Sequence, residues 1–337
     1  MKKTVFLIGS LSALFFTACK KELSDNFSTY TGHPLNDTIW VKNVPNTASV
    51  HDLFTNLMPG FIVDSFNVSA GTTFRFGDSL EITFSPGSCI GPGSTGVPAG
   101  NARLEIMPLK TKGDFIRTFR PTTTNENILE TGGGFFMRVS KDNQELVLAT
   151  GATVKLKFTD VDTPKLNMQV FYGKENNPVP QKGIDTSFFW IRDFDTTALP
   201  VWSKTSNNPL VPSYMGYELI SKNLRWVVAQ RYIDSTQPKT KITAILSPNY
   251  TNKNTAVFAV FANQKTVVNL RGDYPSRSFN AKNIPLRSAV KLISLSKIGS
   301  AYYLGVKNIS SVATVTSYTI VPTEKSLKDI LVFLNSL

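Results

Sequence analysis

The sequence has few of the residues on which most enzymes build nucleophilic and metal sites. Its 337 residues include two cysteines, Cys19 and Cys89, and two histidines, His33 and His51. A catalytic triad would depend on His51, because His33 lies in a polar stretch, and no G-x-S-x-G turn is present to carry a serine nucleophile. The clustered ligands of a histidine-based zinc site are also missing. We therefore expect no metal and no cofactor, and we expect that the protein is not an enzyme.

Long apolar runs are absent beyond the first 18 residues. The mean hydropathy of −0.07 and the hydrophobic content of 41% describe a globular body in water. The one apolar run, from Val5 to Phe16, follows Lys2 and Lys3. It is about a dozen residues long, whereas a membrane-spanning helix needs roughly 20, so it is typical of a signal peptide.

This apolar run ends at a cysteine, in the order Phe16-Thr17-Ala18-Cys19. The stretch resembles the lipobox of bacterial lipoprotein signal peptides, with Phe16 where that family usually has leucine. The resemblance implies cleavage before Cys19 and a membrane anchor of two or three acyl chains, which together give stable attachment. The alternative is an ordinary signal peptide in which Cys19 is incidental.

Lys20 follows the cysteine, where an acidic residue would favour retention at the inner membrane. By the same resemblance, we expect an outer-membrane lipoprotein, and the sequence leaves open whether it faces the periplasm or the cell exterior. When Lys2 and Lys3 leave with the signal peptide, the formal net charge falls from +12 to +10. The basic residues are scattered and form no stripe, so we expect no nucleic-acid partner. Anionic headgroups, polyanionic glycans or solubility alone would account for the charge.

Lipidation of Cys19 would leave Cys89 without a partner, so we expect no intrachain disulfide. Within "FSPGSCIGPG", Cys89 is either a small buried residue or a loop thiol.

Short β-type runs fill residues 60–175 and resume after residue 216. Val154, Leu156 and Phe158 alternate with lysines, which is the pattern of a half-buried strand. Turn residues, such as those at Lys112-Gly113-Asp114, separate the runs, and helical spacing is absent from the first region. The sequence therefore predicts a mainly β fold with two antiparallel, sandwich-like domains.

The last residues break this pattern. Leu327, Ile330 and Leu334 have helical spacing, and Ser326 with Asp329 begins like a capping box, which predicts a short C-terminal helix on its own sheet. The predicted order is a signal peptide at 1–18, a polar tether at 19–45, an N-terminal β domain at 46–175, a Pro- and Asn-rich connection at 176–215 and a C-terminal β domain at 216–337.

Residues 80–151 resemble a β-rich region of Bacteroidota cell-envelope lipoproteins and, more remotely, ZU5-like modules. The resemblance depends on a Pro-Gly turn, an "RLEI" strand, an "LETGG" turn and the strand Phe135–Val139, and "LRWVVAQRYID" is similar to the start of the second half of these lipoproteins. This resemblance implies a fold and a cellular compartment, and it implies no catalytic or binding residues.

Two motifs are given structural interpretations. Gly91–Gly96 matches G-x-G-x-x-G, but a dinucleotide site needs a helix to begin there, and a strand follows instead. Arg271-Gly272-Asp273 spells an adhesion tripeptide, which we interpret as ordinary hairpin chemistry.

The remaining candidates lie near the predicted connection. Trp190, Trp202 and Tyr214 are either a platform for sugar rings or the filling of an interdomain interface. Asp193 and Asp195 are an acidic pair that a hydrolase or a Ca²⁺ site would use, although such pairs are common on solvated strands. The favoured hypothesis is a lipid-anchored envelope protein with a binding or structural role and with glycans or other envelope proteins as possible partners. A surface glycan-binding lipoprotein is the alternative, and a carboxylate-dependent hydrolase is third.

Overall fold

The computed structural model describes residues 37–77, 79–160, 164–175, 184–194, 201–204, 214–233 and 236–337. Met1–Asp37 and Thr38–Leu337 are separate units, and the fold described here is that of the second. Cys19, the predicted signal peptide and most of the predicted tether lie outside the described residues.

The first half of the fold is a sandwich of two sheets. Its sheets pair antiparallel throughout. The larger sheet has the order β1 (Ile62–Asn67), β5 (Asn101–Leu109), β6 (Leu129–Lys141), β14 (Arg225–Tyr232), β10 (Gln169–Lys174) and β11 (Phe189–Arg192), with β7 (Gln144–Glu145) beside β6. The smaller sheet has the order β12 (Val201–Lys204), β13 (Tyr214–Ser221), β9 (Val154–Asp160), β3 (Leu80–Phe84) and β2 (Thr72–Phe76). A separate pair joins β4 (Cys89–Ile90) to β8 (Val147–Leu148).

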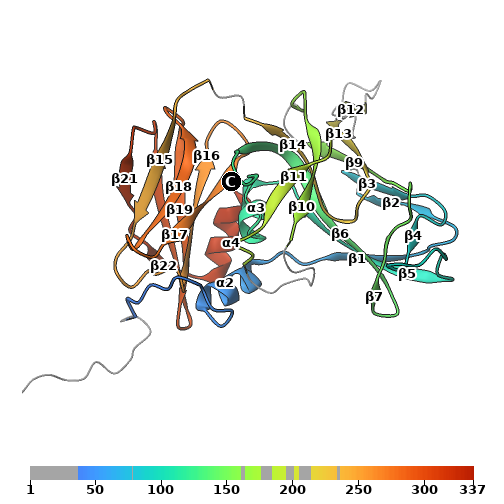
Figure 1. Cartoon of the computed structure of the whole chain (residues 1–337), viewed down its shortest axis with the longest axis horizontal. Helices are drawn as coiled ribbons and strands as arrows, with labels where there is room; N and C mark the ends of the chain where they lie inside the picture. The colour runs from blue at the N-terminus through green and yellow to red at the C-terminus, as the bar shows by residue number, and fades with distance from the viewer. Residues whose placement is uncertain are drawn as a thin grey trace, which may run out of the picture. The chain divides into compact units, whose positions relative to one another are not determined.

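The second half is a curled eight-stranded sheet (Figure 1). One pair in it, β15 with β21, is parallel. Its order is β21 (Thr316–Thr319), β15 (Lys239–Ile245), β18 (Ser278–Pro285), β17 (Val267–Asp273), β16 (Thr255–Phe261), β19 (Val290–Ile298), β20 (Ala301–Ile309) and β22 (Thr323–Lys325). The predicted mainly β, antiparallel, sandwich-like fold is confirmed.

An apolar sandwich core fills the space between the first two sheets. In β9 the predicted alternation is confirmed, because Val154, Leu156 and Phe158 are all buried there. Lys155 and Lys157 point to the opposite face, where both pair with Glu218 of β13.

The larger sheet is also covered on its other face, by a second core that we call the junction core. In β14, Val227 and Ala229 face the sandwich core while Trp226 and Val228 face the junction core. Strand β16 of the curled sheet is divided in the same way between the junction core and a third core enclosed by that sheet. Both strands read as continuous apolar runs because each is buried on both faces.

Three helices lie between the larger sheet and the curled sheet and complete the junction core (Figure 1). They are α2 (Ser49–Leu57), α3 (Lys112–Arg117) and α4 (Leu327–Asn335). Arg117 joins all three, because its guanidinium donates to the Leu57 carbonyl at 2.9 Å and to Asn335 Oδ1 at 3.1 Å. The two β regions are also linked directly where Thr122 exchanges hydrogen bonds with Val267 of β17.

The C-terminal helix is confirmed, with Ser326 as its N-cap. It packs on α3 so closely that a Cβ on Gly113 would overlap the Leu334 carbonyl oxygen. The predicted turn at Lys112-Gly113-Asp114 is wrong, because this segment begins α3. Thr111 and Asp114 form a reciprocal capping box there, which satisfies the free N–H groups of the first turn.

The predicted interdomain connection at 176–215 lies partly outside the described residues. The strands after it continue the sandwich: β13 adds to the smaller sheet, and β14 inserts between β6 and β10 of the larger one. Strand pairing changes from the sandwich to the curled sheet only between β14 and β15. The division into two domains stays a prediction, since both β regions contribute to one junction core.

Candidate functional site

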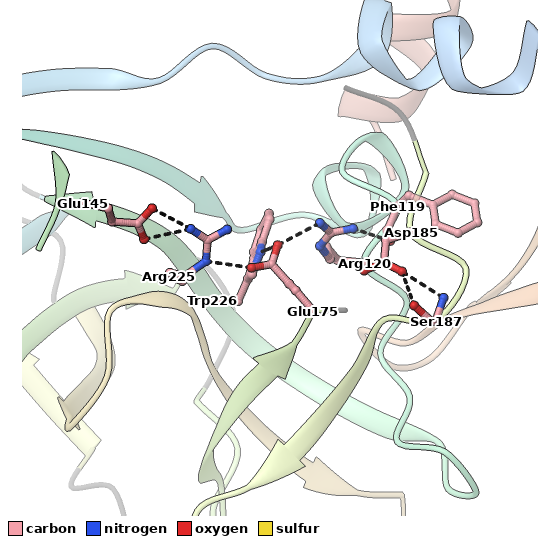
Figure 2. Close-up of polar contacts among 8 residues, drawn as sticks. All are labelled: Phe119, Arg120, Glu145, Glu175, Asp185, Ser187, Arg225 and Trp226. Atoms are coloured by element: carbon pink, nitrogen blue, oxygen red, sulfur yellow. Dashed lines mark hydrogen bonds and ion pairs between the residues drawn. The ribbon is translucent and has the colours of Figure 1, made fainter. Parts of the chain in front are cut away.

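A buried ionic network borders the junction core, and Arg120 is at its centre (Figure 2). The Arg120 side chain is 6% exposed, and its guanidinium lies over the rings of both Phe188 and Trp226, 4.4 and 4.5 Å from their centroids. Burial lowers the pKa of Arg120 to about 10, and the nearby carboxylates of Glu175 and Asp185 oppose that shift. Arg120 therefore needs a carboxylate partner to stay charged at low cost inside the protein.

Glu175, which follows β10, is that partner. It accepts from Arg120 Nη2 at 3.4 Å, from Arg225 Nε at 2.7 Å and from Trp226 Nε1 at 2.7 Å. Arg225 continues the chain of contacts to Glu145 of β7 at 2.8 Å, and hydrogen bonds with both carboxylates raise its pKa against the effect of burial. The network thus connects β7, β10 and β14 to the loop after α3.

A cavity of about 530 Å³ lies on the other side of this loop, between the two β regions. Phe119 lines it next to Arg120, and Asp185 lines it while also acting on the charge of Arg120. The volume falls in the range of small-molecule sites. We call this cavity the junction pocket. Its polar lining comprises Lys42, Asn43, Asn46, His51, Asp185, Thr186, Asn252, Thr255, Asn269 and Arg271.

One wall of the pocket is the segment before α2, which is tied to the curled sheet. Asn252 accepts from the Val41 amide at 3.1 Å and donates to the Val41 carbonyl at 2.6 Å. Trp40 packs on Phe279 with ring centroids 4.9 Å apart. A Cβ on Gly272 would lie 2.8 Å from the Asn252 Cβ, so this glycine allows the close approach. The Arg-Gly-Asp sequence thus lies within β17 and serves the packing of the pocket wall.

His51 of α2 lies on the pocket lining, with one ring nitrogen bonded and the other buried. Its Nδ1 accepts from the Ile184 amide at 3.3 Å, so the neutral ring carries its hydrogen on Nε2. Burial lowers the pKa of His51, although Asp52 opposes the shift, and the imidazole is neutral at pH 7. Nε2 has no hydrogen-bond partner among the described residues.

The charges on the lining are unequal. Lys42 and Arg271 are exposed, and neither forms an ion pair within the described part of the chain. Asp185 is the one carboxylate among the described lining residues, and it accepts from the amide of Ser187 at 3.0 Å and from its hydroxyl. The pocket therefore presents two cations and several amides around one carboxylate that already has local partners.

Of the three predicted glycan-binding aromatics, the structure describes the side chain of Trp190. Trp190 is buried in the junction core, where it meets Phe188 edge-to-face and donates from Nε1 to the Pro121 carbonyl at 2.9 Å. Neither of its faces is open to a sugar ring, so the platform alternative is wrong for Trp190, and the interface alternative accounts for this residue. Trp202 and Tyr214 lie on the paired strands β12 and β13, and their side chains are outside the described structure.

The predicted acidic pair is described only in part. Asp193 accepts from the Tyr172 hydroxyl at 3.2 Å, and Asp195 lies outside the described residues. Within the described ranges, no group of three or more His, Cys, Asp or Glu residues could hold a metal ion. Asp193 is therefore placed as a partner of a tyrosine, and the pair itself stays a prediction.

Cys89 is fully buried in the sandwich core, and burial raises the pKa of its thiol to about 11. The alternative of a small buried residue accounts for it.

The pocket and the network include residues that the sequence did not single out. Lys42, Arg120, Glu175 and Asp185 come from segments with no motif, and His51 was considered only for a triad. The one available signal is the presence of charged residues inside strongly apolar segments, as at Arg120 in "FIRTFRP".

Comparison with family models and with curated proteins finds no match to this chain. In the part of the chain that the structure describes, no helix has the length and apolar character needed to cross a membrane.

Proposed function

We propose that this chain is a lipid-anchored protein of the outer membrane, held by acyl chains on Cys19, and that its folded part binds a ligand in the junction pocket. The proposed role is binding, without chemical turnover. The anchor is supported by the order of residues around Cys19. The main support for the binding role is the junction pocket.

The pocket supports binding because its wall is fixed and two of its charged side chains are unpaired. The wall segment is held by Asn252 and Trp40, while Lys42 and Arg271 form no ion pair among the described residues. A wall that is already ordered loses little conformational entropy when a ligand binds.

Metabolic labelling with an alkyne analogue of palmitate tests the anchor. We expect the wild type and Cys89→Ala to be labelled and Cys19→Ala to be unlabelled. Equal labelling of Cys19→Ala and the wild type would contradict lipidation at Cys19. Separation of the two membranes on a density gradient tests the location, and recovery of the labelled protein with the inner membrane would contradict the outer-membrane assignment.

A further inference from the structure

The charged and polar groups on the lining of the junction pocket indicate the chemical class of its ligand. We propose that it binds an acidic sugar, a saccharide that carries a carboxylate, with Lys42 and Arg271 on the carboxylate and the neutral polar groups on the hydroxyls. This inference rests on the proposed binding function and specifies the ligand class for the same site.

Charge is the first argument. Lys42 and Arg271 are the two fully cationic residues on the lining, and neither has an ion-pair partner among the described residues. A guanidinium matches the geometry of a carboxylate, and a lysine adds a second charge-assisted donor. The Asp185 carboxylate already accepts hydrogen bonds from the amide and hydroxyl of Ser187. A ligand with a negative group therefore complements the pocket better than a neutral or cationic one.

The neutral groups give the second argument. Asn43 and Asn46 are exposed on the wall segment, and Asn269 uses its amide nitrogen on the Val257 carbonyl at 3.1 Å, which leaves its side-chain oxygen as an acceptor. His51 also lies on the lining, but its Nε2 is buried. Such a mixture of donors and acceptors suits hydroxyl groups, each of which both donates and accepts.

The apolar groups exclude a different kind of ligand. Phe119 and Phe279 line the pocket but are only 4% and 2% exposed. The described lining therefore offers no open aromatic surface for an apolar peptide side chain, and we expect recognition to depend on polar contacts. An acidic sugar fits this lining better than a peptide does.

Calorimetry with three matched probes tests the assignment, on the full mature lipoprotein in detergent. The probes are trigalacturonate, its fully methyl-esterified form, which keeps the hydroxyls but lacks the charges, and triglutamate, which keeps the charges but lacks the hydroxyls. We expect trigalacturonate to bind at least about tenfold more tightly than either of the others, since one charge-assisted contact is worth about this factor.

Variants place the binding in the pocket. Lys42→Gln and Arg271→Gln are each expected to weaken trigalacturonate binding about tenfold while leaving the ester unchanged. Asn46→Ala is expected to weaken both sugars and not triglutamate. Lys307→Gln, an exposed lysine of β20, is the control and leaves all three affinities unchanged. Unfolding temperatures equal to that of the wild type show that the variants are folded.

The results distinguish a wrong ligand class from a wrong binding site. Equal affinity for the ester, or tighter binding of triglutamate, would overturn the acidic-sugar assignment and leave the pocket as a binding site if the variants still respond. Binding that no pocket variant alters, or no binding of any probe, would overturn both the ligand class and the use of this pocket.

Discussion

The sandwich core and the junction core are built from the same kinds of strands, yet they differ in what they enclose. The sandwich core is lined mainly by apolar side chains, and its cysteine is fully buried among them. The junction core borders on Arg120, Glu175 and Arg225, and the pocket opens beside it. Charges taken out of water contribute less to stability than apolar packing of the same volume. The comparison shows that charged groups and a pocket gather at the junction core, whereas the sandwich core is filled by apolar packing.

Removing one charge from the buried ionic network is expected to lower the stability of the protein most. Glu175→Gln leaves Arg120 buried without its carboxylate, and we expect the free energy of unfolding to fall by about 3–5 kcal/mol. Urea unfolding measures the change. The control is Glu81→Gln, whose partners Arg75 and Lys157 are 70% and 26% exposed, and it is expected to cost about 1 kcal/mol or less. If both variants lose the same small amount of unfolding free energy, then buried Arg120 does not depend on the carboxylate of Glu175.

The second test concerns the contact between α3 and α4. Gly113→Ala places a methyl group on the Leu334 carbonyl, so the helices must separate, at an expected cost of about 1–3 kcal/mol. Gly60→Ala is the matched control because a Cβ there meets nothing within 4 Å, and its effect is expected to stay within about 0.5 kcal/mol. If both variants unfold at the same temperature, the close helix contact is wrong.

A smaller effect is expected from pH. The pKa of His51 lies below 6.5 in the folded state, so the unfolded chain binds the proton more readily and stability falls as the pH drops through 6.5. Protonation also removes the acceptor for the Ile184 amide. Urea midpoints between pH 7.5 and 5.5 are expected to fall less in His51→Gln than in the wild type. Identical slopes in the two proteins would contradict this role of His51.

The next test leaves the folded protein unchanged and measures the accessibility of a cysteine in the sandwich core. Once Cys19 is lipidated, Cys89 is the remaining cysteine, and its raised pKa and full burial predict no reaction with a thiol reagent at pH 8 in the native protein. Denaturant is expected to expose it to rapid reaction. Fast labelling without denaturant would show that the sandwich core is open on the timescale of the experiment.

The sequence predicted what depends on local patterns. The alternation at Val154 to Phe158 and the cap at Ser326 each lie within a few residues, and the structure confirms both. Two helices were missed although signals for them exist. Val50, Leu53, Phe54 and Leu57 have helical spacing in α2, and Thr111 with Asp114 forms the capping box of α3. These helices are short, and the turn residues Gly113 and Asp114 hid the second one.

The candidate site was not predictable in the same way. Arg120 and Glu175 are 55 residues apart, and Arg225 and Glu145 are 80 apart, so no spacing rule relates them. The pocket depends on the pairing of Asn252 with Val41 across 211 residues. For the same reason, a clustering of aromatic residues in the sequence could not distinguish an exposed platform from the buried position that Trp190 occupies.

Hydrogen exchange across a denaturant series tests most directly whether the two β regions share the junction core. The measurement follows the protection of peptides from β3 and β9 in the sandwich and from β17 and β18 in the curled sheet. A shared core, with the pocket between the regions, predicts that all four strands lose protection together at one denaturant concentration. Separate transitions for the two pairs would show that the regions unfold independently, and that the junction between them does not hold the molecule together.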